Sequence, residues 1–374
     1  MYSIPLFDLN YDSQEELAML ETLRSKWISA GPKTAEFESM FAKKLSVSHA
    51  LATANCTVAL HLAMKLLDIG QGDEVICPSL TFVATANAIK YVDAVPVFCD
   101  ISSLDDLTIN PSLFEKLLTK KTKAIMVMHY GGFACNMDAI VSFAQQHNLR
   151  IIEDACHGPS STYHNQALGT IGDIGCFSFF SNKNISTGEG GMLVTNNDDI
   201  AAKAKLLRSH GMTSASYDRA RGHSTLYDVV DLGYNYRMDD MRSTLGIVQL
   251  NKLSDEVTKR AEIRKLYISL LGDNSKIIIP FRTYDEYCTN YIFPIVVKDS
   301  DYANRAEIRG KLHDAGIQTS VHYPPVHKFE IYKTNNLKLP LTEYASDNLI
   351  TLPMYSKLQP EQIEFISNTL NRIL

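Results

Sequence analysis

Residues 45–210 alternate between short apolar segments and segments whose apolar residues have helical spacing, and this alternation restricts the possible folds more than any other feature. Several of the apolar segments are continuous, as in strands that are buried on both faces. We expect strands at 74–78, 95–100, 124–130, 150–154, 176–180 and 191–196. Helices are expected between them, at 57–67, 85–92, 137–148 and 199–210. This order predicts an α/β fold with a largely parallel sheet and helices on both of its faces.

The last third of the chain has a different pattern. Residues 241–272 are largely helical in character, with a possible break near Leu253–Ser254, and could bridge two domains. A smaller α+β domain is expected beyond them, with a strand at 291–300, a helix at 303–316, a strand at 318–325 and a terminal helix at 360–374. The predicted division is a large α/β domain over 1–250 and a small domain over 251–374. Within residues 1–30, a helix at 14–26 is expected to pack near the small domain.

Composition excludes several classes of protein. The net charge of -6 gives no sign of a general nucleic-acid or membrane-surface binder. The chain has no run of 18 apolar residues, and its first residues lack the basic and apolar regions of a secretion signal. The seven cysteines form no C-x-x-C pair, so we expect free thiols and a cytoplasmic protein. No His/Cys spacing resembles a metal site.

The segment RIIEDACH ends a predicted strand with an acidic residue. Ligands of open α/β sheets bind beyond the carboxyl ends of the strands, so Asp154 and the nearby His157 are candidates for a site. An acidic residue at this point is often only a helix cap, and a single histidine is more often structural.

The segment CFSFFSNKNISTGEGGM places Lys183 in a polar loop after another predicted strand. Such a lysine is usually a solvated surface residue. However, Ser178 lies five residues before it and three glycines follow, and glycines allow the backbone to approach a ligand closely. A protected site can lower the pKa of a lysine amine, which favours Schiff-base formation with a carbonyl group.

The segment ATANCTVALHLAM opens a helix near Cys56 and Thr57. The free N–H groups there suit an anion such as phosphate, although Thr57 could be a plain helix cap. No dinucleotide or P-loop motif is present. Together the three segments supply a phosphate site, a carboxylate for a pyridine nitrogen and a lysine nucleophile. This is the set that an enzyme dependent on pyridoxal 5'-phosphate (PLP) requires.

Spaced motifs along nearly the whole chain resemble those of the DegT-type (DegT/DnrJ/StrS) sugar aminotransferases, which are fold type I PLP enzymes. In chain order the motifs are WISAGPKTAEFE, ANCTVALHLA, PSLTFVATANAI, EDACH, FSFFSNKNISTGEGGM, GYNYRM and HYPPVH. The resemblance implies a large domain with a mostly parallel seven-stranded sheet and a smaller C-terminal α+β domain.

The resemblance also implies roles for the catalytic and cofactor-binding residues. Lys183 would hold the cofactor as a Schiff base and move the proton, and Asp154 would pair with the pyridine nitrogen. His157 would lie near the phenolic oxygen of the cofactor. The remaining cofactor contacts would be Phe82 on the ring, with Cys56, Thr57, Ser178 and Asn235 on the phosphate. Cys56 stands where the family commonly has Gly or Ala, so its backbone N–H is the group expected to act.

Substrate contacts implied by the resemblance are Pro32, Lys33, Thr34, Arg237, Tyr323 and His327. The family implies a homodimer with shared active sites, in which Asn235 and the loop around Pro32–Thr34 reach the neighbouring subunit. The implied reaction moves an amino group from glutamate, or glutamine, to a keto group of a nucleotide-linked deoxysugar. One branch of the family has histidine in place of the lysine and performs dehydration, so Lys183 favours transamination. Alternatives are keto-sugar dehydration, transamination of a keto-cyclitol, and a PLP-dependent sensor without turnover.

Overall fold

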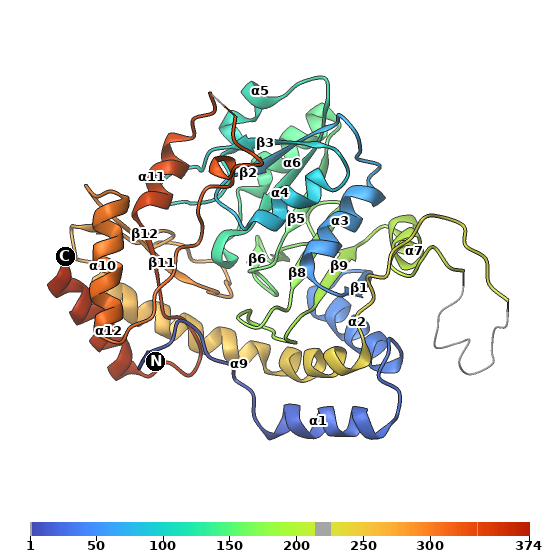
Figure 1. Ribbon diagram of the computed structural model, residues 1–374, viewed down its shortest axis with the longest axis horizontal. Helices are drawn as coiled ribbons and strands as arrows, with labels where there is room; N and C mark the ends of the chain where they lie inside the picture. Colours follow the sequence, from blue (N-terminus) through green and yellow to red (C-terminus); the bar gives the residue numbers. More distant parts are fainter. Residues whose placement is uncertain (1, 214–225, 335) are drawn as a thin grey trace.

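The computed structural model describes residues 2–213, 226–334 and 336–374. Its central feature is a seven-stranded sheet in the order β1-β9-β8-β5-β4-β2-β3 (Figure 1). Neighbouring pairs from β8 to β3 are parallel, whereas β9 is antiparallel to both β1 and β8. The strands are β1 (His49–Thr53), β2 (Glu74–Pro78), β3 (Val95–Cys99), β4 (Thr122–Met128), β5 (Arg150–Asp154), β8 (Ile174–Ser178) and β9 (Gly191–Thr195). The prediction of a mostly parallel seven-stranded sheet is confirmed.

Helices cover both faces of this sheet. One face carries α3 (Cys56–Leu66), α4 (Val83–Lys90) and α7 (Asp198–Leu207), which pack on residues such as Val75, Met126 and Leu193. The other face carries α6 (Met137–His147) and the short α5 (Phe114–Leu117) over Ile76 and Ile125. It also carries α2 (Pro32–Leu45) and α9 (Asp240–Leu271) at the β1 end. Burial of both faces explains why the strands read as continuous apolar segments. A two-stranded hairpin, β6 (Thr162–Tyr163) and β7 (Gln166–Ala167), and short 3₁₀ turns at 111–113, 130–132 and 326–328 complete this part.

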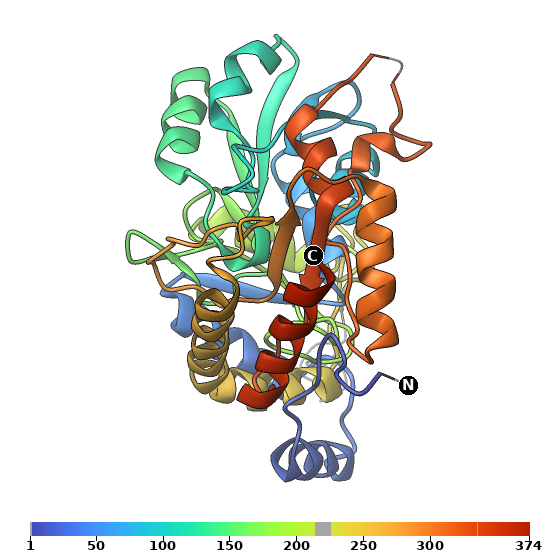
Figure 2. The ribbon, with the colours of Figure 1, turned by 90° about the vertical axis from the view of Figure 1, so that its left-hand side faces the viewer.

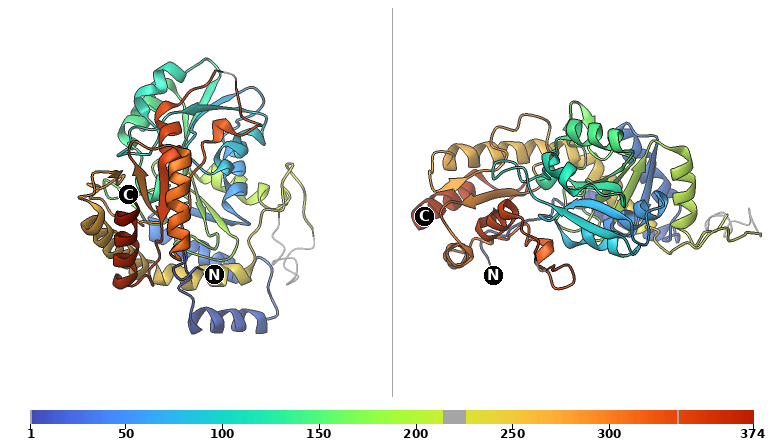
Figure 3. Two further views of the ribbon diagram at one scale, coloured as in Figure 1. Left: turned by 60° about the vertical axis from the view of Figure 1, so that its left-hand side comes forward. Right: turned by 90° about the horizontal axis from the view of Figure 1, so that it is seen from above.

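The C-terminal part forms a second core around a three-stranded antiparallel sheet. Its strands are β10 (Ile277–Ile278), β11 (Phe293–Val297) and β12 (Leu349–Leu352), in that order. The helices α10 (Tyr302–Asp314), α11 (Pro340–Asn348) and α12 (Pro360–Ile373) lie beside this sheet (Figure 2). Seen from above, this part lies at one end of the molecule and α7 at the other (Figure 3). The predicted strand at 318–325 is wrong, because this segment pairs only through a single bridge between Ser320 and Thr351.

Helix α9 joins the two cores without interruption. It contacts α2 and α1 through its first half and α12 further along, and Figure 1 shows it running beneath both parts. The predicted break near Leu253–Ser254 is absent, since Leu253 is fully buried against the large core and neither residue is a helix breaker. A domain boundary at residue 250 falls inside this helix and stays a prediction.

The N-terminal segment crosses from one core to the other. Ile4 packs in the C-terminal core and pairs with Ile317. The predicted helix is present as α1 (Ser13–Arg24), but it packs against the first half of α9, where Thr22 hydrogen-bonds Thr244 at 2.7 Å. Helix α2 was not predicted; its apolar face is Phe37, Phe41 and Leu45. Among the described residues, no helix combines the length and the apolar character needed to cross a membrane.

Candidate active site

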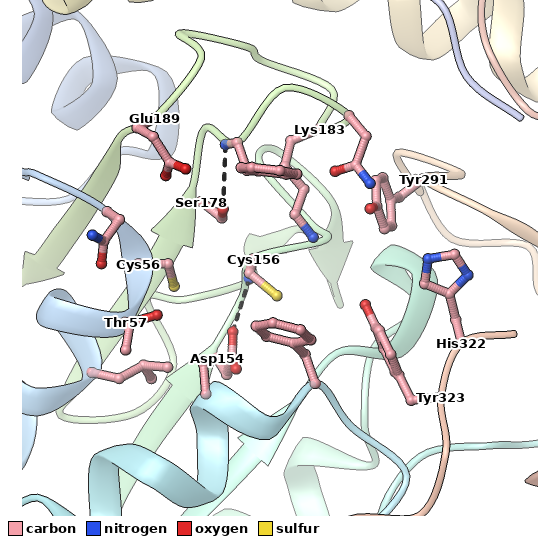
Figure 4. Close-up of a pocket in the computed structure, with 16 residues that line it drawn as sticks. Cys56, Thr57, Asp154, Cys156, Ser178, Lys183, Glu189, Tyr291, His322 and Tyr323 are labelled. Carbon is pink, nitrogen blue, oxygen red and sulfur yellow. Dashed lines mark hydrogen bonds between the residues drawn. The ribbon is translucent and has the colours of Figure 1, made fainter. Parts of the chain in front are cut away.

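The carboxyl ends of the parallel strands border a cavity of about 460 Å³ (Figure 4). Asp154 is the last residue of β5, Ser178 is the last residue of β8, and Lys183 follows in the loop to β9. The first residues of α3 and the first turn of α4 supply other walls. Seven of the residues singled out from the sequence line this cavity: Cys56, Thr57, Phe82, Asp154, Ser178, Lys183 and Tyr323.

Asp154 is a buried carboxylate whose orientation is set by its neighbours. The hydroxyl of Thr85 donates to Oδ2 at 2.8 Å, and the backbone N–H of Cys156 donates to Oδ1 at 3.3 Å. Thr85 itself is fully buried and exchanges a hydrogen bond of 2.7 Å with Thr81 one helical turn earlier. The long contact leaves Oδ1 able to accept a stronger hydrogen bond from a cation in the cavity.

Lys183 points its amine into the cavity from the side opposite to Asp154 (Figure 4). Its Nζ lies 4.2 Å from the centre of the Tyr291 ring. Burial lowers the pKa of the Lys183 amine, but Tyr291, Cys156 and Asp154 raise it by more, and the net result is a raised pKa. The lowered pKa considered from the sequence is therefore not found. A charged amine at this place must give up its proton before it can attack a carbonyl carbon.

The first turn of α3 forms the anion-binding end of the cavity. Asn55 caps the helix by accepting from the backbone N–H of Val58, so the N–H groups of the first residues, Cys56 and Thr57, remain for a ligand. Burial raises the pKa of the Cys56 thiol well above its usual value, so this side chain stays neutral and the backbone N–H is the useful group. The hydroxyls of Thr57 and Ser178 border the same end.

Glycines keep the lysine loop close to this turn. A Cβ on Gly191 would lie 2.4 Å from the backbone carbon of Asn55 and 2.6 Å from the Cys56 nitrogen. Gly188 has a φ of +78°, which other residues rarely adopt. The glycine at 191 therefore allows two backbone segments to approach each other, rather than a segment to approach a ligand as the sequence suggested.

Several other predicted residues lie outside the cavity of this chain. His157 is buried behind Tyr323, and its Nε2 lies 2.8 Å from the Tyr323 hydroxyl. His327 is also buried, with Nδ1 bonded to the Ser79 hydroxyl at 2.7 Å and Nε2 to Glu343 at 3.2 Å. Both of its ring nitrogens thus already have partners within the chain.

The loop around residues 32–34 is the first turn of helix α2. Asp240 accepts hydrogen bonds from the backbone N–H groups of Gly31, Lys33 and Thr34 and from the Thr34 hydroxyl. The hydroxyl and N–H of Thr34 are therefore both used inside the chain. Pro32 is the first helical residue, and Lys33 pairs with Glu36 at 2.8 Å.

The segment with Asn235 and Arg237 runs beside the first turn of α3. The backbone N–H of Ala54 donates to the Tyr236 carbonyl at 2.8 Å. Asn235 is exposed, and Arg237 donates to the Ser209 hydroxyl at 3.0 Å. Neither side chain lines the cavity of its own chain.

The cavity also contains residues that the sequence did not reveal. Tyr291 and His322 come from the C-terminal part. Nothing in the local sequence marks Tyr291, and His322 opens the quoted motif HYPPVH, in which it was given no role. Glu189 was part of a quoted motif without a role, and it stands exposed at the cavity wall. Burial, with a further effect of Lys183, lowers the pKa of His322 to about 3, so His322 is neutral at physiological pH.

The half-buried Lys183, the held carboxylate opposite it and the helix N-terminus at the far end of the cavity together fit pyridoxal phosphate group by group. The fold and the cavity together define a fold type I enzyme of the PLP-dependent class. Residues 10–371 match the model of the DegT/DnrJ/EryC1/StrS aminotransferase family, and the chain belongs to that family. It is an aminotransferase.

Individual relatives agree along the full length of the chain. It is 37% identical to the spore coat polysaccharide biosynthesis protein SpsC of Bacillus subtilis, over 100% of this chain and 96% of that protein. It is 36% identical to GDP-perosamine synthase of Escherichia coli O157:H7, over 99% and 98%. The PLP-form of Spr1654 from Streptococcus pneumoniae is 29% identical, with a TM-score of 0.91 over 100% and 98% of the two chains. That protein has also been solved in its PMP-form. The prediction of PLP as the cofactor is confirmed.

Proposed function

We propose that this aminotransferase transfers an amino group from glutamate to a keto group of a nucleotide-linked sugar, as one step in making an amino sugar. The observation that carries the proposal is the placement of Lys183 and Asp154 on opposite sides of one cavity whose far end is the first turn of α3. Similarity to GDP-perosamine synthase over nearly the whole of both chains supports a nucleotide-linked sugar as the acceptor.

Each wall of the cavity has a task in this reaction. Asp154 would hold a protonated ring nitrogen, with Thr85 fixing the carboxylate. The backbone N–H groups of Cys56 and Thr57, with the Ser178 hydroxyl, would bind the phosphate. The ring of Phe82, which is 55% exposed, would cover one face of the cofactor.

Bound PLP supplies an electron sink that stabilises negative charge on the substrate carbon that carries the nitrogen. Lys183 would hold the cofactor through its amine. The same Nζ, when free, would take a proton from the substrate carbon and return one. The amine lies 4.2 Å from the centre of the Tyr291 ring and borders the cavity, where it could reach a bound substrate.

The active site is proposed to be completed by a second copy of the chain. Among the described residues that line the cavity, Lys183 is the only cationic side chain, yet a glutamate donor brings carboxylates that require a cation. Arg237 and the exposed Asn235 would come from the partner. The same segment exposes Val229, Val230 and Leu232, with 56%, 56% and 82% of their surfaces accessible, as expected of an interface.

Two inactive variants test the shared site. We expect mixed dimers of Lys183→Ala chains and Asn235→Ala/Arg237→Ala chains to regain activity, because one of the two sites then carries neither defect. Verified mixed dimers that stay inactive, although each parent is folded, would contradict a shared site.

The acceptor is tested with a panel of nucleotide-linked keto-sugars and mass detection of the aminated product, with Lys183→Ala as the control. Glutamate and glutamine are compared as donors. Loss of water from the sugar without amination would point to a dehydratase. Amination of a keto-cyclitol, and of no nucleotide-linked sugar, would mean that the acceptor is a keto-cyclitol. Absence of spectral conversion with any amino donor would favour a sensor.

Free, buried thiols at all seven cysteines support the cytoplasmic location that we propose.

A further inference from the structure

His157 directs both of its ring nitrogens to protein atoms and not to the cavity. Its side chain is buried, and its ring stacks on Tyr291 with centres 4.3 Å apart. The backbone N–H of Gly131 lies 3.1 Å from Nδ1, and the Tyr323 hydroxyl lies 2.8 Å from Nε2. Any effect of His157 on a bound molecule must therefore pass through another residue.

The directions of these two hydrogen bonds follow from the Gly131 contact. A backbone N–H can only donate, so Nδ1 accepts and carries no proton. In the neutral ring the proton is then on Nε2, which donates to the Tyr323 oxygen. Burial, with further effects of Lys183 and His322, lowers the pKa of His157 well below its usual value, so the neutral ring is the relevant form.

Tyr323 is left with a hydroxyl proton of its own. Burial raises the pKa of Tyr323 well above its usual value, so the hydroxyl stays protonated. Among the described residues, His157 is the only hydrogen-bond partner of this hydroxyl. Tyr323 lines the cavity between the rings of Phe82 and His322, at 6.1 Å and 4.9 Å, and its oxygen points inward (Figure 4).

We propose that Tyr323 donates a hydrogen bond to an oxygen atom of the molecule bound in the cavity, and that His157 is a positioning residue that acts through Tyr323. This inference rests on the proposed function, which supplies two such acceptors: the phenolic oxygen of the cofactor and an oxygen of the keto-sugar. It replaces the direct contact between His157 and the cofactor that the family resemblance implied.

The role of His157 does not require a change in its protonation. The neutral imidazole donates from Nε2 to the Tyr323 oxygen at any physiological pH. A glutamine at position 157 could present an N–H in its place, whereas leucine could not. The consequence is a specific pattern of coupling between two positions, which a merely structural histidine would not produce.

A double-mutant cycle of Tyr323→Phe and His157→Leu tests this coupling, with His157→Gln as the matched control. Two properties are measured for each variant of the full-length protein. The first, without sugar, is the dissociation constant of PLP and the pH titration of its visible absorbance. The second is kcat and KM with the best keto-sugar of the panel.

We expect Tyr323→Phe and His157→Leu each to weaken the same one of these properties, either PLP affinity or the kinetic constants with the sugar. The expected loss is about ten-fold, which corresponds to one hydrogen bond at about 1.4 kcal/mol. The double variant should be no worse than Tyr323→Phe alone, and His157→Gln should remain close to the wild type. A change in the cofactor titration identifies the phenolic oxygen as the acceptor. A change confined to the sugar's kinetic constants identifies a sugar oxygen.

The inference is overturned if the two substitutions have additive effects, or if Tyr323→Phe matches the wild type in both properties. If His157→Leu does not fold, Tyr323→Phe alone decides, because the hydroxyl donor is then the only part of the inference under test. The cofactor titration requires no sugar, so it can succeed even if every keto-sugar is refused. A wild type that binds no PLP would instead contradict the proposed function.

Discussion

Replacing Thr85 by valine removes the strongest contact that holds Asp154. The two side chains have nearly the same shape, and Thr85 is fully buried, so the main change is loss of the hydroxyl. Oδ2 of Asp154 then loses a donor at 2.8 Å, and Thr81 loses its 2.7 Å partner. The Thr81 hydroxyl is almost completely buried, so water does not easily replace its lost partner.

The expected cost follows from these two contacts. A hydrogen bond to a charged group contributes roughly 1.5–3 kcal/mol, and the bond between the two hydroxyls about 1 kcal/mol. We expect the free energy of unfolding of the cofactor-free protein to fall by about 3 kcal/mol in Thr85→Val. Turnover should also fall, by roughly 10- to 100-fold at saturating PLP, because a mobile carboxylate holds the ring nitrogen less well.

Urea denaturation followed by circular dichroism measures the first effect, and steady-state kinetics the second. Thr85→Ser is the matched control, because it keeps the hydroxyl and should recover most of both losses. Wild-type stability together with wild-type turnover in Thr85→Val would refute the role given to this hydroxyl.

Three further predictions concern the walls of the cavity. Asp154→Asn should fold but lose most activity at saturating PLP, since an amide cannot stabilise a protonated ring nitrogen as a carboxylate does; near-normal turnover would show that another group holds it. Gly191→Ala should weaken PLP binding, measured by fluorescence titration, because the new Cβ would lie within 2.6 Å of the Asn55–Cys56 backbone and displace the phosphate turn; unchanged affinity would contradict this. The cofactor-free protein should lose about 2 kcal/mol of stability between pH 7 and pH 5 through His322. Its pKa of about 3 in the folded chain lies below the 6.5 of a free histidine, so the unfolded chain binds the extra proton as the pH falls. His322→Gln should show a shallower pH dependence in urea denaturation, and an identical slope would exclude this cause.

Local sequence patterns predicted six of the seven strands of the central sheet, including the partly exposed β3, and missed β1. The predictions at 74–78 and 150–154 coincide with β2 and β5. Strand β1, at the edge of the sheet, has the sequence HALAT, whose small and polar residues have little strand preference. The segment 318–325 contains Thr319, Val321 and Tyr323, which favour strands, but Pro324 and Pro325 have no N–H to donate to a neighbouring strand.

The residues of the cavity, too, were only partly predictable from the sequence. Asp154, Ser178 and Lys183 lie in or just after the last residues of predicted strands, so the rule that ligands bind at the carboxyl ends was enough to group them. Tyr291 and His322 are brought in by the C-terminal core from far along the chain. Only the tertiary structure reveals Tyr291, which lies outside every quoted motif, and the place of His322 in the cavity. His327 illustrates the opposite case, since a histidine in a family motif proves to bond Ser79 and Glu343 inside the protein.

The most direct test of the account is to find the lysine that carries the cofactor. The PLP-bound wild type is reduced with borohydride, digested, and mapped by mass spectrometry, with Lys183→Ala treated in parallel. We predict a pyridoxyl group on Lys183 in the wild type and on no lysine in the variant. A label on another lysine, or labelling that survives in Lys183→Ala at the wild-type level, would contradict the assignment of this cavity as the active site.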